Sequence, residues 1–156
     1  ALAILVTDGR PVFYVSERMR TPDQPFNLWK FRTMRVVEND AGVSGGDKVD
    51  RITPIGRFLR RTRADELPQL WNVLKGDMSL VGPRPMLPEQ QEKYPGRAYY
   101  TQRPGITGSW QVSERNACTF TDRARFDTDY VANLSFANDM KLLVSTVRVV
   151  VNGTGY

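Results

Sequence analysis

The sequence predicts an α+β domain, in which several amphipathic helices surround a small antiparallel β-hairpin and the late helices form a membrane-facing side. Residues 12–15 and 26–31 are rich in strand formers, whereas residues 53–76 carry apolar side chains at helical spacing. With 156 residues, 40% of them hydrophobic and 25% charged, the chain fits one domain, residues 1–156, that can bury a core.

The first predicted element is the hairpin, whose two strands are joined by a long polar loop. That loop contains the turn formers Pro22, Asp23 and Pro25. Residues 38–50 follow as a polar segment with three glycines, and we expect a mobile surface loop there.

Two short helices come next. Thr53 suits an N-cap and Pro54 a first helical residue, and the expected buried stripe consists of Ile55, Phe58, Leu59 and Thr62. The second helix ends where Gly76 can adopt the left-handed cap, and its expected buried stripe consists of Leu67, Leu70, Trp71 and Leu74. Asp65 and Glu66 are thereby predicted at the N-terminus of this second helix.

The elements of the C-terminal half are predicted from the positions of glycine and proline and from the apolar content of each segment. We expect a stiff extended loop at 79–88, a helix at 89–94, a Gly/Pro loop running into a strand at 103–112, and helices at 120–131 and 134–151. The last helix is more apolar than a solvent-facing helix needs to be, so it packs in the core or lies on a membrane surface. The apolar opening, residues 1–6, favours the membrane and resembles the tail of an apolar element.

The composition excludes several classes of site. The chain has no histidine, which rules out imidazole bases, imidazole zinc ligands and Ser/His or Cys/His nucleophile pairs. The single cysteine, Cys118, excludes an intramolecular disulfide and favours a reducing, cytoplasmic setting. A formal net charge of +5 indicates an anionic partner. Exposed aromatics are not interleaved with the basic residues, so no nucleic-acid partner is predicted.

An arginine-rich stretch precedes an adjacent carboxylate pair, Asp65 and Glu66. The five arginines are Arg51, Arg57, Arg60, Arg61 and Arg63. Either Asp65 only caps a helix, or the arginines hold a polyanion against an ionised carboxylate that attacks phosphorus or binds Mg²⁺. Arg84 stands between two prolines, which would fix its guanidinium at low entropic cost.

Further candidates have two interpretations each. Lys30 and Arg32 point to the same face of a strand, where they bind phosphate or keep an edge strand soluble. Trp110 and Tyr99 stack on a base, or Trp110 belongs to the core.

Five ordered motifs resemble the bacterial sugar transferase family, the monotopic polyprenyl-phosphate phosphoglycosyl transferases. They are KFRTM (30–34), RITPIG (51–56), DELPQLWN (65–72), GDMSLVGPRP (76–85) and RPGITG (103–108). The resemblance covers residues 11–156. It implies transfer of a sugar 1-phosphate from a UDP-sugar to undecaprenyl phosphate with release of UMP, the first membrane step of exopolysaccharide, capsule or O-antigen synthesis.

The resemblance also assigns residues. Asp65 resembles the nucleophile that forms a phosphosugar-aspartyl intermediate, Glu66 the Mg²⁺ ligand, and Arg84 the phosphate clamp. The further substrate-binding candidates are Lys30, Arg32, Arg61 and Arg115. Glu114, beside Arg115, stands where the family commonly has glycine.

Family members carry an N-terminal membrane helix, so the resemblance implies a catalytic domain on the cytoplasmic face of the bacterial inner membrane, with residues 1–6 as the end of that helix. The alternative from another class is a catalytically idle membrane-surface module, in which the two carboxylates only cap a helix.

Overall fold

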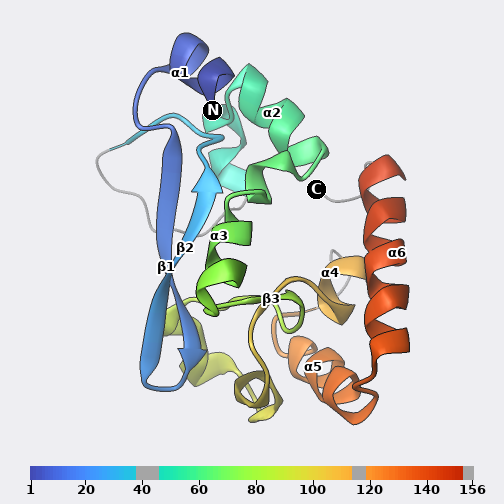
Figure 1. Ribbon diagram of the computed structural model, residues 1–156. Coiled ribbons are helices and arrows are strands. Elements are labelled where there is room, and N and C mark those ends of the chain that lie inside the picture. The colour runs from blue at the N-terminus through green and yellow to red at the C-terminus, as the bar shows by residue number, and fades with distance from the viewer. Residues whose placement is uncertain (38–45, 114–118, 153–156) are drawn as a thin grey trace.

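The computed structural model describes residues 1–37, 46–113 and 119–152 (Figure 1). It has the predicted α+β fold, with a two-stranded antiparallel hairpin on one side and helices α5 and α6 on the other. The helices are α1 (Leu2–Asp8), α2 (Pro54–Arg61), α3 (Gln69–Lys75), α4 (Ser109–Val112), α5 (Arg123–Ala132) and α6 (Phe136–Asn152). The strands are β1 (Phe13–Thr21), β2 (Gln24–Phe31), β3 (Ser79–Val81) and β4 (Gly105–Thr107).

The hairpin is longer than predicted and its turn is tight. β1 and β2 pair from Phe13 opposite Phe31 to Thr21 opposite Gln24. The predicted long loop is therefore wrong, because its polar residues continue both strands. One side of the hairpin is solvated, so the strands tolerate polar side chains there. The predicted loop at 38–50 lies partly outside the described residues, and its end forms a 3-10 turn, Gly46–Arg51.

Helix α2 begins as predicted, but its apolar stripe is not fully buried. The Thr53 hydroxyl accepts a hydrogen bond from the Gly56 backbone N–H at 3.0 Å, and Pro54 is the first helical residue. Phe58, predicted in the buried stripe, is 60% exposed. A Cβ on Gly56 would collide with the Thr33 carbonyl, so glycine allows α2 to approach the end of β2 closely.

Helix α3 is turned the opposite way from the prediction. Its apolar residues Leu70, Trp71 and Leu74 are exposed, whereas Gln69 and Asn72 are buried. Asn72 donates to the Asn27 carbonyl at 2.7 Å and accepts from the Trp29 N–H at 3.2 Å. The edge of a two-stranded sheet leaves backbone groups unpaired, and a polar side chain of α3 satisfies them.

Two loops predicted to be irregular form a short parallel pair. Ser79 lies opposite Gly105 and Val81 opposite Thr107, so the predicted extended loop at 79–88 begins as a strand. The strand in 103–112 comes earlier than predicted, because residues 109–112 form α4. The predicted helix at 89–94 is a 3-10 helix, Pro88–Lys93.

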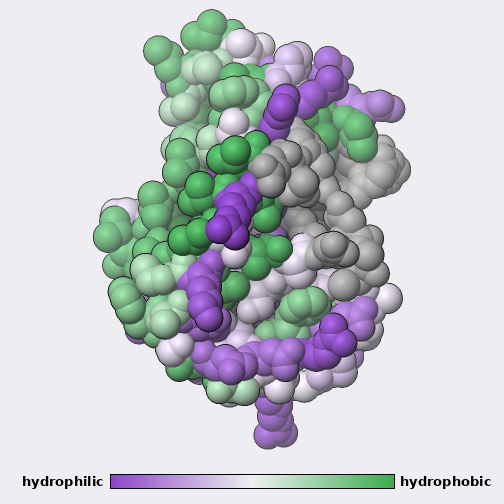
Figure 2. Space-filling model, turned by 90° about the vertical axis from the view of Figure 1, so that its right-hand side faces the viewer, coloured by the Kyte–Doolittle hydropathy of each residue, from purple (hydrophilic) through white to green (hydrophobic). Residues whose placement is uncertain are grey.

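The late helices occur where they were predicted. Helix α6 packs against α4, β3 and β4, and Leu142 joins Val81 and Tyr130 in a buried cluster. Its outer face carries Phe136, Met140, Val144, Val147 and Val151, all exposed. Figure 2 looks onto this side of the molecule, and many apolar residues gather on its left-hand half. Within the described ranges, no helix combines the length and apolar character needed to cross a bilayer.

A separate buried cluster packs against Met19, near the end of β1, and consists largely of tyrosines. Tyr94 and Tyr99 pack edge to face with Tyr100 around Met19 and Met86. Tyr99 is completely buried, so the interpretation that it stacks on a ligand is wrong. Trp110 packs edge to face on Phe126 with ring centroids 5.6 Å apart, which supports the core interpretation.

Candidate functional site

Asp65 and Glu66 lie in a 3-10 turn, Ala64–Glu66, which fills the space between α2 and α3. Arg63, immediately before it, adopts the left-handed conformation with φ 56°. This backbone state is uncommon for a non-glycine residue and redirects the chain sharply. Pro68 is the N-cap residue of α3, so the interpretation of Asp65 as a helix cap is wrong.

Glu66 is held in its ionised form by surrounding cations. Its carboxylate Oε1 accepts a hydrogen bond from Lys30 Nζ at 2.7 Å, and Oε2 lies 3.9 Å from Arg63 Nη1. Burial by itself would raise the pKa of Glu66, but Lys30, Arg84 and Arg63 together lower it to about 2. This carboxylate is therefore a permanent anion at physiological pH.

Asp65 has a different environment, although it is the next residue along the chain. It is 9% exposed, and its Oδ1 is buried without a hydrogen-bond partner. Burial raises the pKa of Asp65, with a smaller contribution from Glu66 in the same direction, while Lys30, Arg60 and Arg63 oppose the shift. Desolvation therefore outweighs the nearby cations in the folded chain. The expectation that Asp65 is ionised stays a prediction.

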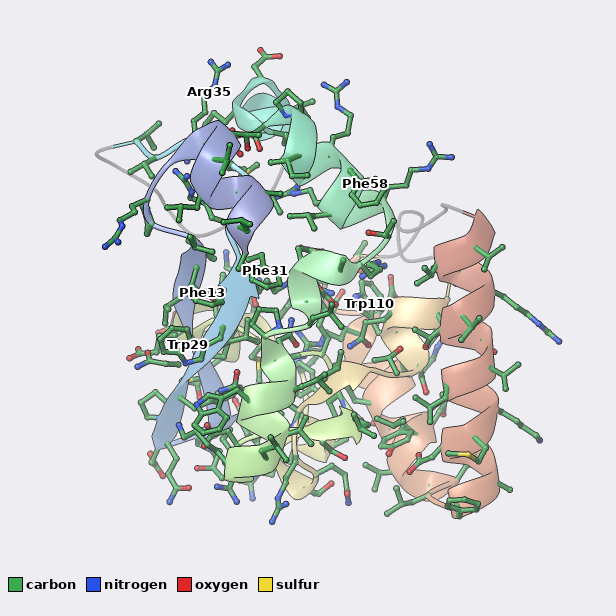
Figure 3. The ribbon with its side chains drawn as sticks, turned by 45° about the horizontal axis from the view of Figure 1, so that its top comes forward. Phe13, Trp29, Phe31, Arg35, Phe58 and Trp110 are labelled. Atoms are coloured by element: carbon green, nitrogen blue, oxygen red, sulfur yellow. The ribbon has the colours of Figure 1, made fainter. Side chains whose placement is uncertain are left out.

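Lys30 reaches Glu66 because aromatic residues fix its strand. Trp29 and Phe31 flank Lys30 on β2 and point to the opposite face of the hairpin, where both pack on Phe13 (Figure 3). The Phe13 and Phe31 rings stack with centroids 5.4 Å apart. Lys30 therefore projects toward α3 and the 3-10 turn.

Arg84 is placed by backbone contacts between two glycine-containing loops. The Gly82 N–H donates to the Thr107 carbonyl at 2.9 Å, and the Gly105 N–H donates to the Pro83 carbonyl at 2.8 Å. A Cβ on Gly82 or Gly105 would collide with the opposite loop, so only glycine allows this approach. The guanidinium of Arg84 lies close enough to lower the pKa of Glu66.

Two predicted site residues that the structure describes, Arg32 and Arg61, form no ion pair with Asp65 or Glu66. Arg32 is buried and donates from Nη2 to the carbonyls of Asp8 at 2.7 Å and Gly9 at 2.9 Å, so it holds the chain after α1. Arg61 is exposed at the end of α2. Arg115 lies outside the described residues. Its assignment and those of Arg32 and Arg61 as substrate ligands stay predictions.

Arg63 belongs to the basic stretch of the sequence but was not predicted as a site residue. Its contact with Glu66 depends on the left-handed backbone, which the residue type does not indicate. Arg18 on β1 was not predicted either: burial lowers the pKa of its guanidinium, and the charge of Arg84 lowers it further. Burial and Arg84 also lower the pKa of Arg123, but the carboxylate partner of Arg123 is Asp127. The interactions with Arg84 join distant segments, so no local pattern predicts them.

The oxygens of Asp65 and Glu66 could serve as ligands for a divalent cation. Asp65 Oδ1 has no partner, and Lys30 occupies only Oε1 of Glu66. Within the described part of the chain, no group of three or more acidic, cysteine or histidine residues could hold a metal. Mg²⁺ is commonly bound by one or two carboxylates plus substrate phosphates, so the pair fits Mg²⁺ when a phosphate ligand completes the shell.

Comparisons with known proteins identify the chain's relatives. The family model described as bacterial sugar transferase matches residues 1–153. The UDP-galactose-lipid carrier transferase of Erwinia amylovora is 41% identical over 99% of this chain and 37% of its own length. The undecaprenyl-phosphate galactose phosphotransferase of Salmonella typhimurium is 40% identical over 95% of this chain and 35% of its own length.

A third relative, the UDP-glucose:undecaprenyl-phosphate glucose-1-phosphate transferase of Escherichia coli, is 39% identical over 94% of this chain and 34% of its own length. The chain thus spans about a third of the length of each of these three relatives. The family match covers nearly every residue, including the carboxylate pair and the Arg84 loop. The chain therefore belongs to the bacterial sugar transferase family.

Proposed function

We propose that this protein transfers a sugar 1-phosphate from a UDP-sugar to undecaprenyl phosphate, with Asp65 as the nucleophile. The observation that carries the proposal is a buried carboxylate with an unpaired oxygen beside an ionised Glu66 and the cations Lys30, Arg63 and Arg84. Relatives at about 40% identity, whose names describe transfer to undecaprenyl phosphate, support the substrate classes.

The transfer proceeds in two displacements at one phosphorus. An oxygen of Asp65 attacks the β-phosphorus of the UDP-sugar, the bond from this phosphorus to the bridging oxygen breaks, and UMP leaves with the electron pair. A phosphate oxygen of undecaprenyl phosphate then attacks the same phosphorus, and the Asp65 carboxylate leaves with the electron pair. Asp65 must be deprotonated to attack, so the reaction slows in acid. Because burial raises the pKa of Asp65, its carboxylate is also a stronger nucleophile once it is deprotonated.

The neighbouring side chains stabilise charge during both displacements. Lys30 and Arg63 compensate Glu66 and reduce the repulsion that two adjacent carboxylates would exert on a diphosphate. Arg84, held by the two loops, binds phosphate oxygens as charge moves onto UMP. Mg²⁺ would be held by Glu66 Oε2 and Asp65 together with substrate phosphate, where it supplies neutralisation of the diphosphate.

The exposed apolar residues support a membrane location for the reaction. Phe58 on α2, Trp71 and Leu74 on α3, and Val147 and Val151 on α6 are each at least 59% exposed. Apolar patches of this kind mark protein or membrane contacts, and the acceptor proposed here resides in a membrane. We place the protein on the cytoplasmic face of the inner membrane, where nucleotide sugars are present.

UMP release measures this function directly. The protein is incubated in membranes with Mg²⁺, undecaprenyl phosphate and a panel of UDP-sugars. We expect release with at least one sugar and a loss of about a thousandfold or more in Asp65→Asn. Asp77→Asn is the matched control. Asp77 pairs with the exposed Lys75 and accepts a hydrogen bond from Asn72, which an asparagine oxygen can still accept, so this variant should leave the rate unchanged.

Equal release by the wild type and Asp65→Asn would overturn the role of Asp65. Absence of release with every sugar would favour the alternative of an idle membrane-surface module.

A further inference from the structure

We infer that the groove between α3 and α6 binds the isoprenoid chain of the lipid phosphate acceptor, an inference that rests on the proposed function. This α3–α6 groove encloses about 200 Å³. Its aliphatic lining includes Leu67, Leu70, Leu80, Ile106, Leu143 and Val150. Such a surface matches a branched hydrocarbon chain and offers little to a sugar or a nucleotide.

The two threonine hydroxyls in the groove wall, those of Thr107 and Thr146, already have hydrogen-bond partners. The Thr146 hydroxyl donates its proton to the Leu142 carbonyl at 2.7 Å. The 2.6 Å contact between the Thr107 and Thr146 hydroxyls must therefore be donated by Thr107. Neither threonine hydroxyl therefore has a proton left for a ligand, which lowers the cost of placing a hydrocarbon beside them.

The charged residues of the described lining are Arg63 and Glu66, the same residues that flank the proposed nucleophile. A lipid phosphate with its chain in the groove would therefore carry its headgroup to the carboxylate pair. Arg63 supplies a cation for that headgroup. Gln111, 5% exposed and also in the lining, has no hydrogen-bond partner for either amide atom, which leaves an N–H for a phosphate oxygen.

The groove is continuous with the apolar exterior of the same two helices. Leu70, in the lining, is followed one turn later by the exposed Leu74, and Val150 is preceded by the exposed Val147. Figure 2 views the molecule from the α6 side, where apolar residues continue along the left of the view. A groove of this volume holds only the first part of a long polyprenyl chain, and the remainder would continue into the membrane.

The test separates donor chemistry from acceptor binding. The donor half-reaction is followed by exchange of labelled UMP into the UDP-sugar without acceptor. The acceptor step is followed with farnesyl phosphate and dimethylallyl phosphate, which share a phosphate but differ in chain length. Leu70→Trp and Val150→Trp narrow the groove, whereas Val144→Trp places the same bulk on the outer face of α6, outside the groove.

In the wild type, we expect a higher kcat/KM for farnesyl phosphate than for dimethylallyl phosphate. Narrowing the groove should reduce this preference by about tenfold through a higher KM, while UMP exchange stays unchanged. The exterior variant Val144→Trp should retain the wild-type preference. A chain-length preference that survives both groove variants, with UMP exchange intact, would overturn the inference.

Absence of UMP exchange in the wild type would instead refute the proposed function, which distinguishes the two failures. A loss of thermal stability and of both half-reactions together in the groove variants would show that the groove packs against protein, a second copy or another segment, and would also overturn the inference.

Discussion

Glu66 and Asp127 are both carboxylates with little solvent exposure beside a cation, but their pKa values shift in opposite directions. The side chain of Glu66 is 12% exposed and that of Asp127 only 3%. The pKa of Glu66 falls to about 2, whereas burial raises the pKa of Asp127 despite the nearby Arg123. Desolvation acts on both, so the difference must come from the partners.

The partners differ in number and in geometry. Glu66 accepts a 2.7 Å charge-assisted hydrogen bond from Lys30, and Arg84 and Arg63 add to it. Asp127 lies 3.6 Å from Arg123 Nε, which makes no hydrogen bond, and accepts one from the neutral Tyr94 hydroxyl at 2.9 Å. Several cations with one short hydrogen bond outweigh desolvation, whereas a single distant cation does not.

The comparison separates a site from a structural contact. Several cations surround Glu66, and an anionic substrate would find the same positive charge there. Around Asp127 the same residue types tie α5 to the tyrosine core through Tyr94 and Arg123, whose guanidinium lies over the Tyr99 ring.

The largest expected change in stability comes from Lys30→Met, which removes the hydrogen bond that holds Glu66. We expect the free energy of unfolding at pH 7 to fall by about 2–3 kcal/mol, because a buried anion loses its closest partner while Arg63 and Arg84 remain. Urea-induced unfolding measures this change. The control Lys75→Met disrupts an exposed ion pair and should cost no more than about 0.5 kcal/mol. Equal losses in the two variants would contradict the account.

The lowered pKa of Glu66 makes the free energy of unfolding depend on pH. The pKa of Glu66 is lowered from 4.5 in the unfolded chain to about 2 in the folded chain. Its ionised form therefore contributes stability that is present above about pH 4.5 and lost as the pH falls toward 2. Unfolding of the wild type and Glu66→Gln, measured with a chelator, should differ most near neutral pH and converge in acid. A difference that grows in acid would contradict the assigned direction.

The smallest expected effect belongs to Asp127→Asn. The raised pKa of Asp127 means that its charge is less favourable in the folded chain than in the unfolded chain, so neutralisation at pH 7 should change the unfolding free energy by less than about 1 kcal/mol. The asparagine oxygen can still accept from Tyr94. A loss of unfolding free energy as large as that of Lys30→Met would contradict the proposed difference between Glu66 and Asp127.

Local chemistry predicted some elements well. Thr53 and Pro54 start α2, and Gly76 ends α3 with φ 83°, because capping depends on a few adjacent residues. The carboxylate pair was predicted from the arginine-rich approach and from the ordered motifs, and the structure places Lys30 and Arg84 near it.

Long-range contacts account for the failures. Periodicity predicted that the apolar side of α3 is buried, but the unpaired edge of β2 requires Asn72 on the inner side. The parallel pair β3 and β4 has three residues in each strand, too few for a periodic signal. Arg32 donates hydrogen bonds to the carbonyls of Asp8 and Gly9, which lie 23 or more residues away in the sequence.

The central claim is that Asp65 becomes covalently attached to the sugar phosphate. Mass spectrometry of the protein after addition of a UDP-sugar without acceptor tests it, followed by mapping of the modified peptide. We expect one added sugar phosphate on Asp65, which is removed when undecaprenyl phosphate is supplied and is absent in Asp65→Asn. Turnover without any adduct on Asp65, or an adduct that persists in Asp65→Asn, would contradict it.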